Sequence, residues 1–234
     1  LLGALWTVLG PLAMILVYTL VFSQLMQSRL PGVDNSLGYG FYLCSGFLVW
    51  GMFSDITGRS QTMFLDNANL IKKLNFPRIC LPAVVIGSAI INFGIALALL
   101  LLVFALVGEF PGIVLLALVP LLIIVLAFSA GLGILLGVLN VFFRDVGHLF
   151  GIILQFWFWL TPIVYPVAIL PSFILPVVES NPMTPVISAF QSVLVYQSWP
   201  DWSTLMLPSL AAMVLCAGGL VLFRKRAAEM VDEL

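Results

Sequence analysis

Long stretches without a charged residue are the feature that most constrains this chain. Six of them are long enough to cross a bilayer as helices, which takes about 20 apolar residues each. They are Leu1–Ser28, Asn35–Ser54, Ile79–Gly108, Phe110–Phe143, Leu149–Val178 and Trp202–Phe223. A charge at the bilayer centre costs at least about 2.5 kcal/mol, and backbone groups in lipid must be paired internally. Because no strand-like alternation appears, the pattern predicts an all-α integral membrane protein with six transmembrane helices.

The composition agrees with a membrane location. The 234 residues are 62% hydrophobic and 8% charged, whereas soluble domains carry about 25% charged residues. A formal net charge of -1 argues against a basic nucleic-acid binder. We therefore expect one membrane domain over residues 1–234, surrounded by lipid, with no nucleic acid as partner.

Positive charges fall on one side of the predicted helices. Short cytoplasmic loops retain lysine and arginine. If the segment after the second helix is cytoplasmic, only Arg29 of the nine positive residues lies outside. The other eight are Arg59, Lys72, Lys73, Arg78, Arg144, Arg224, Lys225 and Arg226. The pattern predicts a multi-pass protein with both termini in the cytoplasm.

Two of the predicted loops are unusually long. In the inner segment 66–78, Leu70, Ile71 and Leu74 share one face of a short amphipathic helix that Pro77 ends. The outer segment 162–200 carries seven prolines between apolar stretches. A chain that is apolar but repeatedly broken cannot span a bilayer, so we expect re-entrant helices on the outer side between the fifth and sixth helices. Residues 182–196 are the best helical candidate there.

The residues that membrane enzymes use are scarce. His148 is the only histidine, which excludes a HExxH zinc site, and the GxSxG and GxxxxGK[ST] motifs are absent. The sequence therefore predicts no catalytic site, no metal and no nucleotide site in this chain. Asp55 and Arg59 are expected to pair at i and i+4 near the inner boundary, more as a helix-end ion pair than as a coupling site.

Small and aromatic residues suggest two further features. The GxxxG pattern Gly133–Gly137 lets helices approach closely, either within one chain or between two copies. Aromatic residues gather at 156–159, at Tyr165, and around Trp50 and Phe53. Sugar rings stack on aromatic faces, so these side chains indicate either a carbohydrate path or an interfacial belt.

Four motifs in this order resemble the type 2 ABC exporter permeases, the ABC-2 type transporters. They are LGALW at residues 2–6 with Pro11, NLIKKLNFPR at 69–78, LNVFFRDV at 139–146 and TPIVYP at 161–166. The closest branch is the polysaccharide exporters, which move O-antigen, capsule or teichoic acid chains. The resemblance implies a permease that exports lipid-linked polysaccharide across the bacterial inner membrane, driven by ATP.

The resemblance also implies partners and contact residues. Such permeases are homodimers that work with two copies of a separate cytoplasmic ATPase, which holds the ATP and Mg, so this chain needs no cofactor of its own. Residues 66–78 would form the coupling helix, and Arg144 and Asp145 a second inner contact. The implied coupling residues in the first segment are Asp66, Asn69, Leu70, Ile71, Lys72, Lys73, Leu74, Phe76, Pro77 and Arg78.

In this family the first and fifth helices line the translocation path, and the pieces after Pro162 resemble the outer gate. The candidate path residues are Tyr18, Trp50, Phe53, Phe156, Trp157, Trp159 and Tyr165. Family members begin with an amphipathic interface helix before the LGxxW motif, and we expect the present sequence to lack it.

Two alternatives stay open. One is a drug or lipid exporter with the same fold, which needs no extended sugar path. The other is a membrane-embedded transferase acting on a carrier lipid, which would need acidic groups at the outer face. The outer acids are Asp34, Glu109, Glu179 and Asp201, scattered along the chain.

Overall fold

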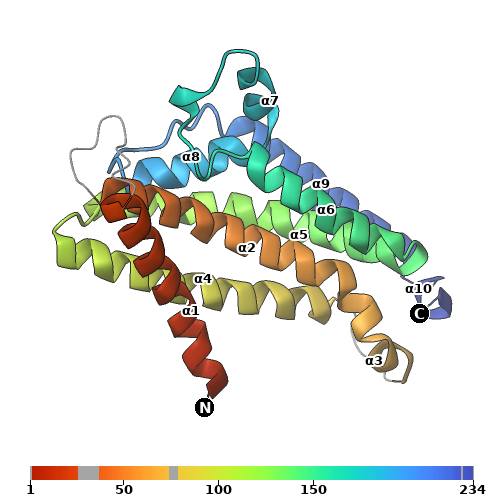
Figure 1. Ribbon diagram of the computed structural model, residues 1–234. Helices are drawn as coiled ribbons and strands as arrows, with labels where there is room; N and C mark the ends of the chain where they lie inside the picture. The colour runs from red at the N-terminus through yellow and green to blue at the C-terminus, as the bar shows by residue number, and fades with distance from the viewer. Residues whose placement is uncertain (1, 26–36, 74–78, 228, 234) are drawn as a thin grey trace.

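The computed structural model describes residues 2–25, 37–73, 79–227 and 229–233, and within these ranges the chain is helical without strands (Figure 1). The expected all-α class is confirmed. The long helices are α1 (Leu2–Tyr18), α2 (Gly38–Asp66), α4 (Cys80–Val107), α5 (Leu118–Phe142), α6 (Asp145–Leu160) and α9 (Met206–Arg226). The short ones are η1 (Thr19–Leu25), α3 (Ala68–Lys73), η2 (Gly112–Ala117), η3 (Val167–Ile169), α7 (Leu175–Ser180), α8 (Met183–Leu194) and α10 (Glu229–Glu233).

Three helices are long and apolar enough to cross a membrane: α4, η2 continued by α5, and α9. The apolar stretch Thr7–Phe22 and helix α6 are shorter. The span expected over 149–178 stops at Leu160, because Thr161 precedes Pro162 and has the extended backbone angles (φ -103°, ψ 132°) that such a residue prefers.

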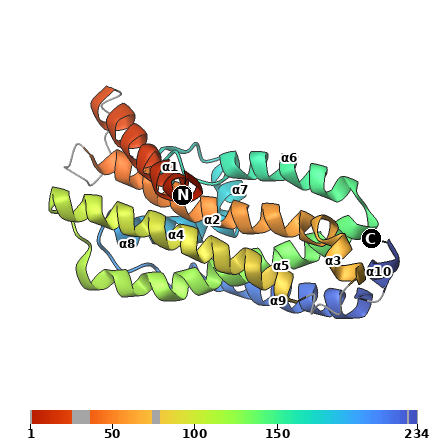
Figure 2. The ribbon, with the colours of Figure 1, turned by 90° about the horizontal axis from the view of Figure 1, so that it is seen from below.

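Helices α2, α4, α5, α6 and α9 form one bundle with α2 at its centre, and α1 crosses this bundle at an angle, with the N-terminus projecting away from it (Figures 1 and 2). Helix α2 contacts α1, α4, α5, α6 and α8, and its Phe53, Ile56 and Phe64 side chains are fully buried. Helices α2, α5 and α9 end, and α4 and α6 begin, at the same end of the bundle, which also carries α3 and α10. We call it the charged end; its charged residues include Asp66, Lys72, Arg144, Asp145, Arg224, Lys225 and Arg226.

Glycines set the closest helix contacts. A Cβ added at Gly131 of α5 would lie 2.4 Å from the backbone nitrogen of Cys216 on α9, and one at Gly219 would lie 2.7 Å from the Gly131 carbonyl oxygen. The pattern Gly133–Gly137 faces Ser60 of α2, where an added Cβ would meet atoms at 2.6 Å. The GxxxG pattern therefore packs helices within this chain.

The segment between α6 and α9 is packed against the bundle. Helix α8 is the helix expected over 182–196, and it contacts α2, α5 and η2. Its Ile187, Phe190 and Leu194 side chains are fully buried. By burying its apolar face, α8 thus anchors the proline-rich segment between α6 and α9 to the bundle.

Candidate functional site

The inner segment begins as the sequence predicts. Asn67 ends α2, with its Nδ2 donating to the carbonyl oxygen of Met63 at 2.8 Å, and its own carbonyl accepts from the backbone of Leu70 at 3.0 Å. This turn directs α3 across the charged end. The predicted coupling residues Leu74, Phe76, Pro77 and Arg78 lie outside the described residues, as does the side chain of Lys73.

The apolar face of α3 packs onto the bundle. Ile71 is only 6% exposed, and Leu70 is half-buried, while Asp66, Asn69 and Lys72 are exposed. Ile71 lies in a cluster contributed by six helices: Met63, Phe64, Leu81, Ile134, Val138, Val141, Phe223 and Met230 are its other members. A partner protein could reach the exposed polar residues, whereas the contact role of Leu70 and Ile71 stays a prediction.

The second predicted inner contact lies at the turn between α5 and α6, where Arg144 and Asp145 are both exposed. Asn140, one turn earlier and 2% exposed, ties this turn to α2. Its Nδ2 donates to the carbonyl oxygen of Gln61 at 2.9 Å, and its Oδ1 accepts from the backbone nitrogen of Gly147 at 2.9 Å. Asn140 therefore hydrogen-bonds both to α2, which leads into α3, and to the start of α6, which follows Arg144.

Aromatic rings join α2 to α6 inside the bundle. The ring centroids of Trp157 and Phe53 are 5.2 Å apart at 75°, and those of Trp157 and Trp50 are 6.4 Å apart at 75°. Phe128 of α5 completes the group, 6.3 Å from Trp157. These edge-to-face contacts favour burial, and Phe53 is fully buried. Within this chain, Trp50, Phe53 and Trp157 hold α6 against α2.

The other four predicted path residues are exposed or half-buried. Phe156 and Trp159 are 67% and 60% exposed on α6. Tyr165 follows α6, and its hydroxyl donates to the Trp159 carbonyl oxygen at 2.6 Å. Tyr18 of α1 stacks on Phe47 of α2 at 4.6 Å. Of the seven predicted residues, Trp50 and Phe53 are thus buried, Trp157, Tyr18 and Tyr165 are half-buried, and Phe156 and Trp159 are exposed on α6.

The end of α6 is fixed by a second amide. Asn181 Oδ1 accepts from Trp157 Nε1 at 2.8 Å and from the backbone nitrogen of Met183 at 3.0 Å. Its Nδ2 donates to Thr161 Oγ1 at 2.9 Å. All these groups meet where the chain leaves α6 and enters α8, so Asn181 orients one end of α6 as Asn140 orients the other.

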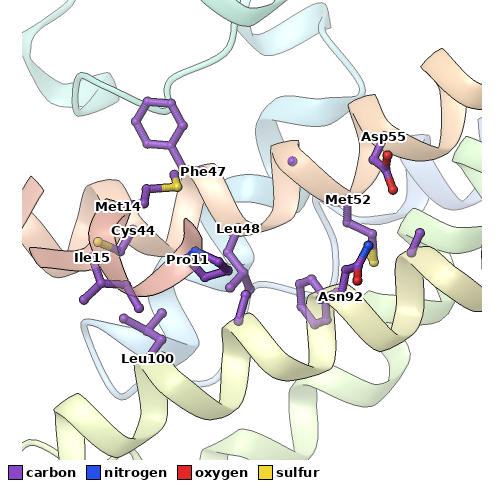
Figure 3. A pocket seen from close by; sticks show the side chains of 14 residues that line it. Pro11, Met14, Ile15, Cys44, Phe47, Leu48, Met52, Asp55, Asn92 and Leu100 are labelled. Atoms are coloured by element: carbon purple, nitrogen blue, oxygen red, sulfur yellow. The ribbon is translucent and has the colours of Figure 1, made fainter. Parts of the chain in front are cut away.

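A cavity of about 250 Å³ lies between α1, α2 and α4 (Figure 3). Its walls are apolar except for Asp55 and Asn92 at one end; Ile15, Cys44 and Leu100 lie toward the other. The expected Asp55 to Arg59 pair is present at 2.5 Å, and Arg59 also donates to Ser88 of α4 at 2.8 Å. The pair thus crosslinks α2 and α4 at the mouth of the cavity.

Among the described residues, no three histidine, cysteine, aspartate or glutamate side chains gather in a way that could hold a metal ion. His148 is exposed near the start of α6.

Sequence reasoning missed Asn140 and Asn181. The signal was available for Asn140, since a lone amide inside the apolar run 118–143 must find partners when buried. Asn181 lies directly before Pro182, which reads as an ordinary loop residue. Neither partner set could be inferred, because Gln61 and Gly147, or Trp157 and Thr161, meet them only in the folded bundle.

Comparisons with known proteins give one consistent result. The family model described as ABC-2 type transporter matches residues 1–195. The chain is 29% identical over 235 residues to the O-antigen export system permease protein RfbA of Myxococcus xanthus, covering 100% of this chain and 88% of that protein. It is 25% identical to a protein of the same name from Klebsiella pneumoniae, covering 96% and 84%. It is 24% identical to the polysialic acid transport protein KpsM of Escherichia coli, covering 98% and 88%.

Proposed function

The chain belongs to the ABC-2 type transporter family, and from this premise we propose that it is the permease subunit of an ATP-driven exporter of lipid-linked polysaccharide. The observation that carries the proposal is the near full-length similarity to permeases named for O-antigen export and to a polysialic acid transport protein. The cargo class is O-antigen, capsule or teichoic acid, and the membrane is the bacterial inner membrane.

The proposal requires a partner that hydrolyses ATP. The sequence has no GxxxxGK[ST] loop with which to hold nucleotide phosphates. We assign ATP and Mg²⁺ to two copies of a cytoplasmic ATPase that dock on a dimer of this chain. The charged end is the surface that fits docking, since it exposes Asn69 and Lys72 on α3 together with Arg144 and Asp145.

The clustering of basic residues supports placing the charged end, and both termini, in the cytoplasm. Six passes are then supplied by α1 with η1, α2, α4, η2 with α5, α6, and α9. Helix α6, with 16 residues, is about 24 Å long and falls short of the roughly 30 Å hydrocarbon core. The residues after Leu160, with η3, α7 and α8, would complete its outer half as re-entrant pieces shielded by the bundle.

The polysaccharide path would run along α6. Phe156 and Trp159 present exposed aromatic faces on which sugar rings can stack. Trp157 is turned inward onto Phe53 and Asn181, so it supports this wall from behind. ATP binding would draw the two ATPases together, and α3 would pass that motion to the helices around the path.

Co-purification tests this proposal. The full-length protein is reconstituted in lipid nanodiscs with its candidate ATPase and sized by light scattering. We expect a complex holding two copies of each subunit, with an ATPase rate that depends on the permease. A permease that stays alone in the presence of the ATPase would contradict the proposal and favour the carrier-lipid transferase.

A further inference from the structure

Helix α6 is held by few contacts. Among its described residues only Phe150 is buried, whereas α5 beside it has buried residues along its whole length. At its far end α6 is fixed by Trp157 and Asn181. At its near end α6 follows α5 after two linking residues, and Asn140 is the side chain that hydrogen-bonds to its first turn.

Asn140 caps α6 from a different helix. The first backbone N–H groups of a helix have no partner within it, and the residue preceding the helix usually satisfies one of them. Here that residue, Arg144, makes no side-chain cap hydrogen bond. The N–H of Gly147, third in the helix, donates to Asn140 Oδ1 at 2.9 Å. The start of α6 is thereby fastened to α5.

The same amide also holds α2. Asn140 Nδ2 donates to the Gln61 carbonyl oxygen at 2.9 Å, five residues before α2 ends at Asp66. Both ends of the amide are therefore committed, one to α2 and one to α6. A Cβ at Gly147 would lie 3.2 Å from both polar atoms of the Asn140 side chain, so the three helices meet here without spare room.

We infer that Asn140 is a positioning residue that transmits displacement of the α2–α3 segment to the start of α6. The inference rests on the proposed function, in which the ATPase moves α3. Gly147 and Trp157 are ten residues apart, so the lever between the pinned start of α6 and its aromatic surface is about 15 Å long. Pulling α2 would then tilt the helix that carries Phe156 and Trp159.

Single-cysteine fluorophore labelling tests the inference. An environment-sensitive dye is placed at Ala68→Cys, a half-buried position on α3, or at Ile152→Cys, an exposed position on α6, after Cys44, Cys80 and Cys216 are replaced by alanine. The labelled permease is combined with its ATPase in nanodiscs, and emission is recorded before and after adding ATP with Mg²⁺. In the parent protein we expect both labels to respond.

Two variants are decisive. Asn140→Leu removes both hydrogen bonds of the amide. Gly147→Ala keeps the amide but displaces it, and it replaces Asn140→Leu as the test if that variant fails to fold. We expect the Ala68→Cys response to persist and the Ile152→Cys response to fall at least fivefold. The matched control is Ser129→Ala, because Ser129 is fully buried on α5 but bonds only to Val125 of its own helix. That control should keep both responses.

A full Ile152→Cys response in both decisive variants would overturn the inference and leave the proposed function standing. So would loss of the Ala68→Cys response in the same variants, since Asn140 would then govern docking. A parent complex in which neither label responds would contradict the proposed function itself, and the inference with it.

Discussion

The indole Nε1 of Trp157 donates a 2.8 Å hydrogen bond to the side-chain oxygen of Asn181, joining the end of α6 to the start of α8. The same oxygen accepts from the backbone of Met183, and the amide nitrogen donates to Thr161. Asn181 is buried, so every polar atom of its side chain has a partner within the protein. The region that would close the outer side of a path is thus organised by one satisfied amide.

Replacing Asn181 with leucine should destabilise the protein by about 2 to 4 kcal/mol. The indole N–H of Trp157 and the N–H of Met183 would lose their acceptor, and an unsatisfied buried donor costs about 1 to 3 kcal/mol. Denaturant or thermal unfolding in detergent micelles measures the change. Asn92→Ala is the control, because Asn92 is exposed on α4 and its loss should cost less than about 0.5 kcal/mol. If Asn181→Leu and Asn92→Ala lowered the free energy of unfolding equally, the hydrogen bonds of Asn181 would not stabilise the fold as described.

Two neighbouring glycines of α9 provide a matched pair. A Cβ at Gly219 would lie 2.7 Å from the Gly131 carbonyl oxygen, whereas nothing lies within 4 Å of a Cβ at Gly218. Gly219→Ala should therefore destabilise the protein by about 1 to 3 kcal/mol, since overpacking forces α5 and α9 apart. Gly218→Ala should be neutral or stabilising by up to about 1 kcal/mol, because alanine favours helix. If the melting temperatures of the two variants shifted in the same direction, this packing of α5 against α9 would be refuted.

On α3, stability and partner binding should separate. Ile71→Ala removes a buried side chain and should cost about 2 to 5 kcal/mol of stability. Lys72→Glu alters an exposed charge, so the permease should keep its stability while its affinity for the ATPase falls by about 1 kcal/mol, or about fivefold in Kd. Unfolding and binding titrations are compared on the same preparations. An unchanged Kd in Lys72→Glu would remove that residue from the docking surface.

The two aromatic groups should also behave differently. Trp50→Ala opens a cavity in the core and should lower stability by about 3 to 5 kcal/mol. Replacing both Phe156 and Trp159 with alanine removes exposed rings, so the protein should stay stable while the glycan export rate falls, by about fivefold if each ring contributes about 0.5 kcal/mol. Export at the parental rate in the double variant would favour a drug or lipid exporter.

The helices themselves could be predicted from the sequence, because charge-free apolar runs leave few other structures in a membrane. The early end of α6 was predictable only in part: Pro162 marks a break, yet the apolar residues on both sides suggested that a span continued to Val178. Within the inner segment predicted over 66–78, the described part holds the six-residue helix α3, which begins two residues after Asp66, and the coupling role of the segment stays a prediction.

The direction of individual side chains was much harder to predict. Leu70 and Ile71 share an apolar face, but sequence periodicity does not say whether that face meets a partner or the same chain. In the structure Ile71 is buried within a cluster of this chain, and α3 contacts α2 and α10. Four consecutive aromatics at 156–159 point in all directions, and only their packing in the fold, of Trp157 on Phe53 and of Phe158 on Trp50, distinguishes the inward rings from the outward ones. Contacts between residues far apart in the sequence therefore decide which side chains of the candidate site are buried and which are exposed.

The most direct test of the central claim is the ATPase rate of the reconstituted complex of this protein and its ATPase, measured with and without undecaprenyl-linked polysaccharide. Undecaprenyl phosphate alone serves as the lipid control. If this protein exports polysaccharide, the glycan-bearing lipid should raise the ATPase rate more than the control lipid does. An ATPase rate that responds to neither, in a complex of two permeases and two ATPases, would contradict polysaccharide export.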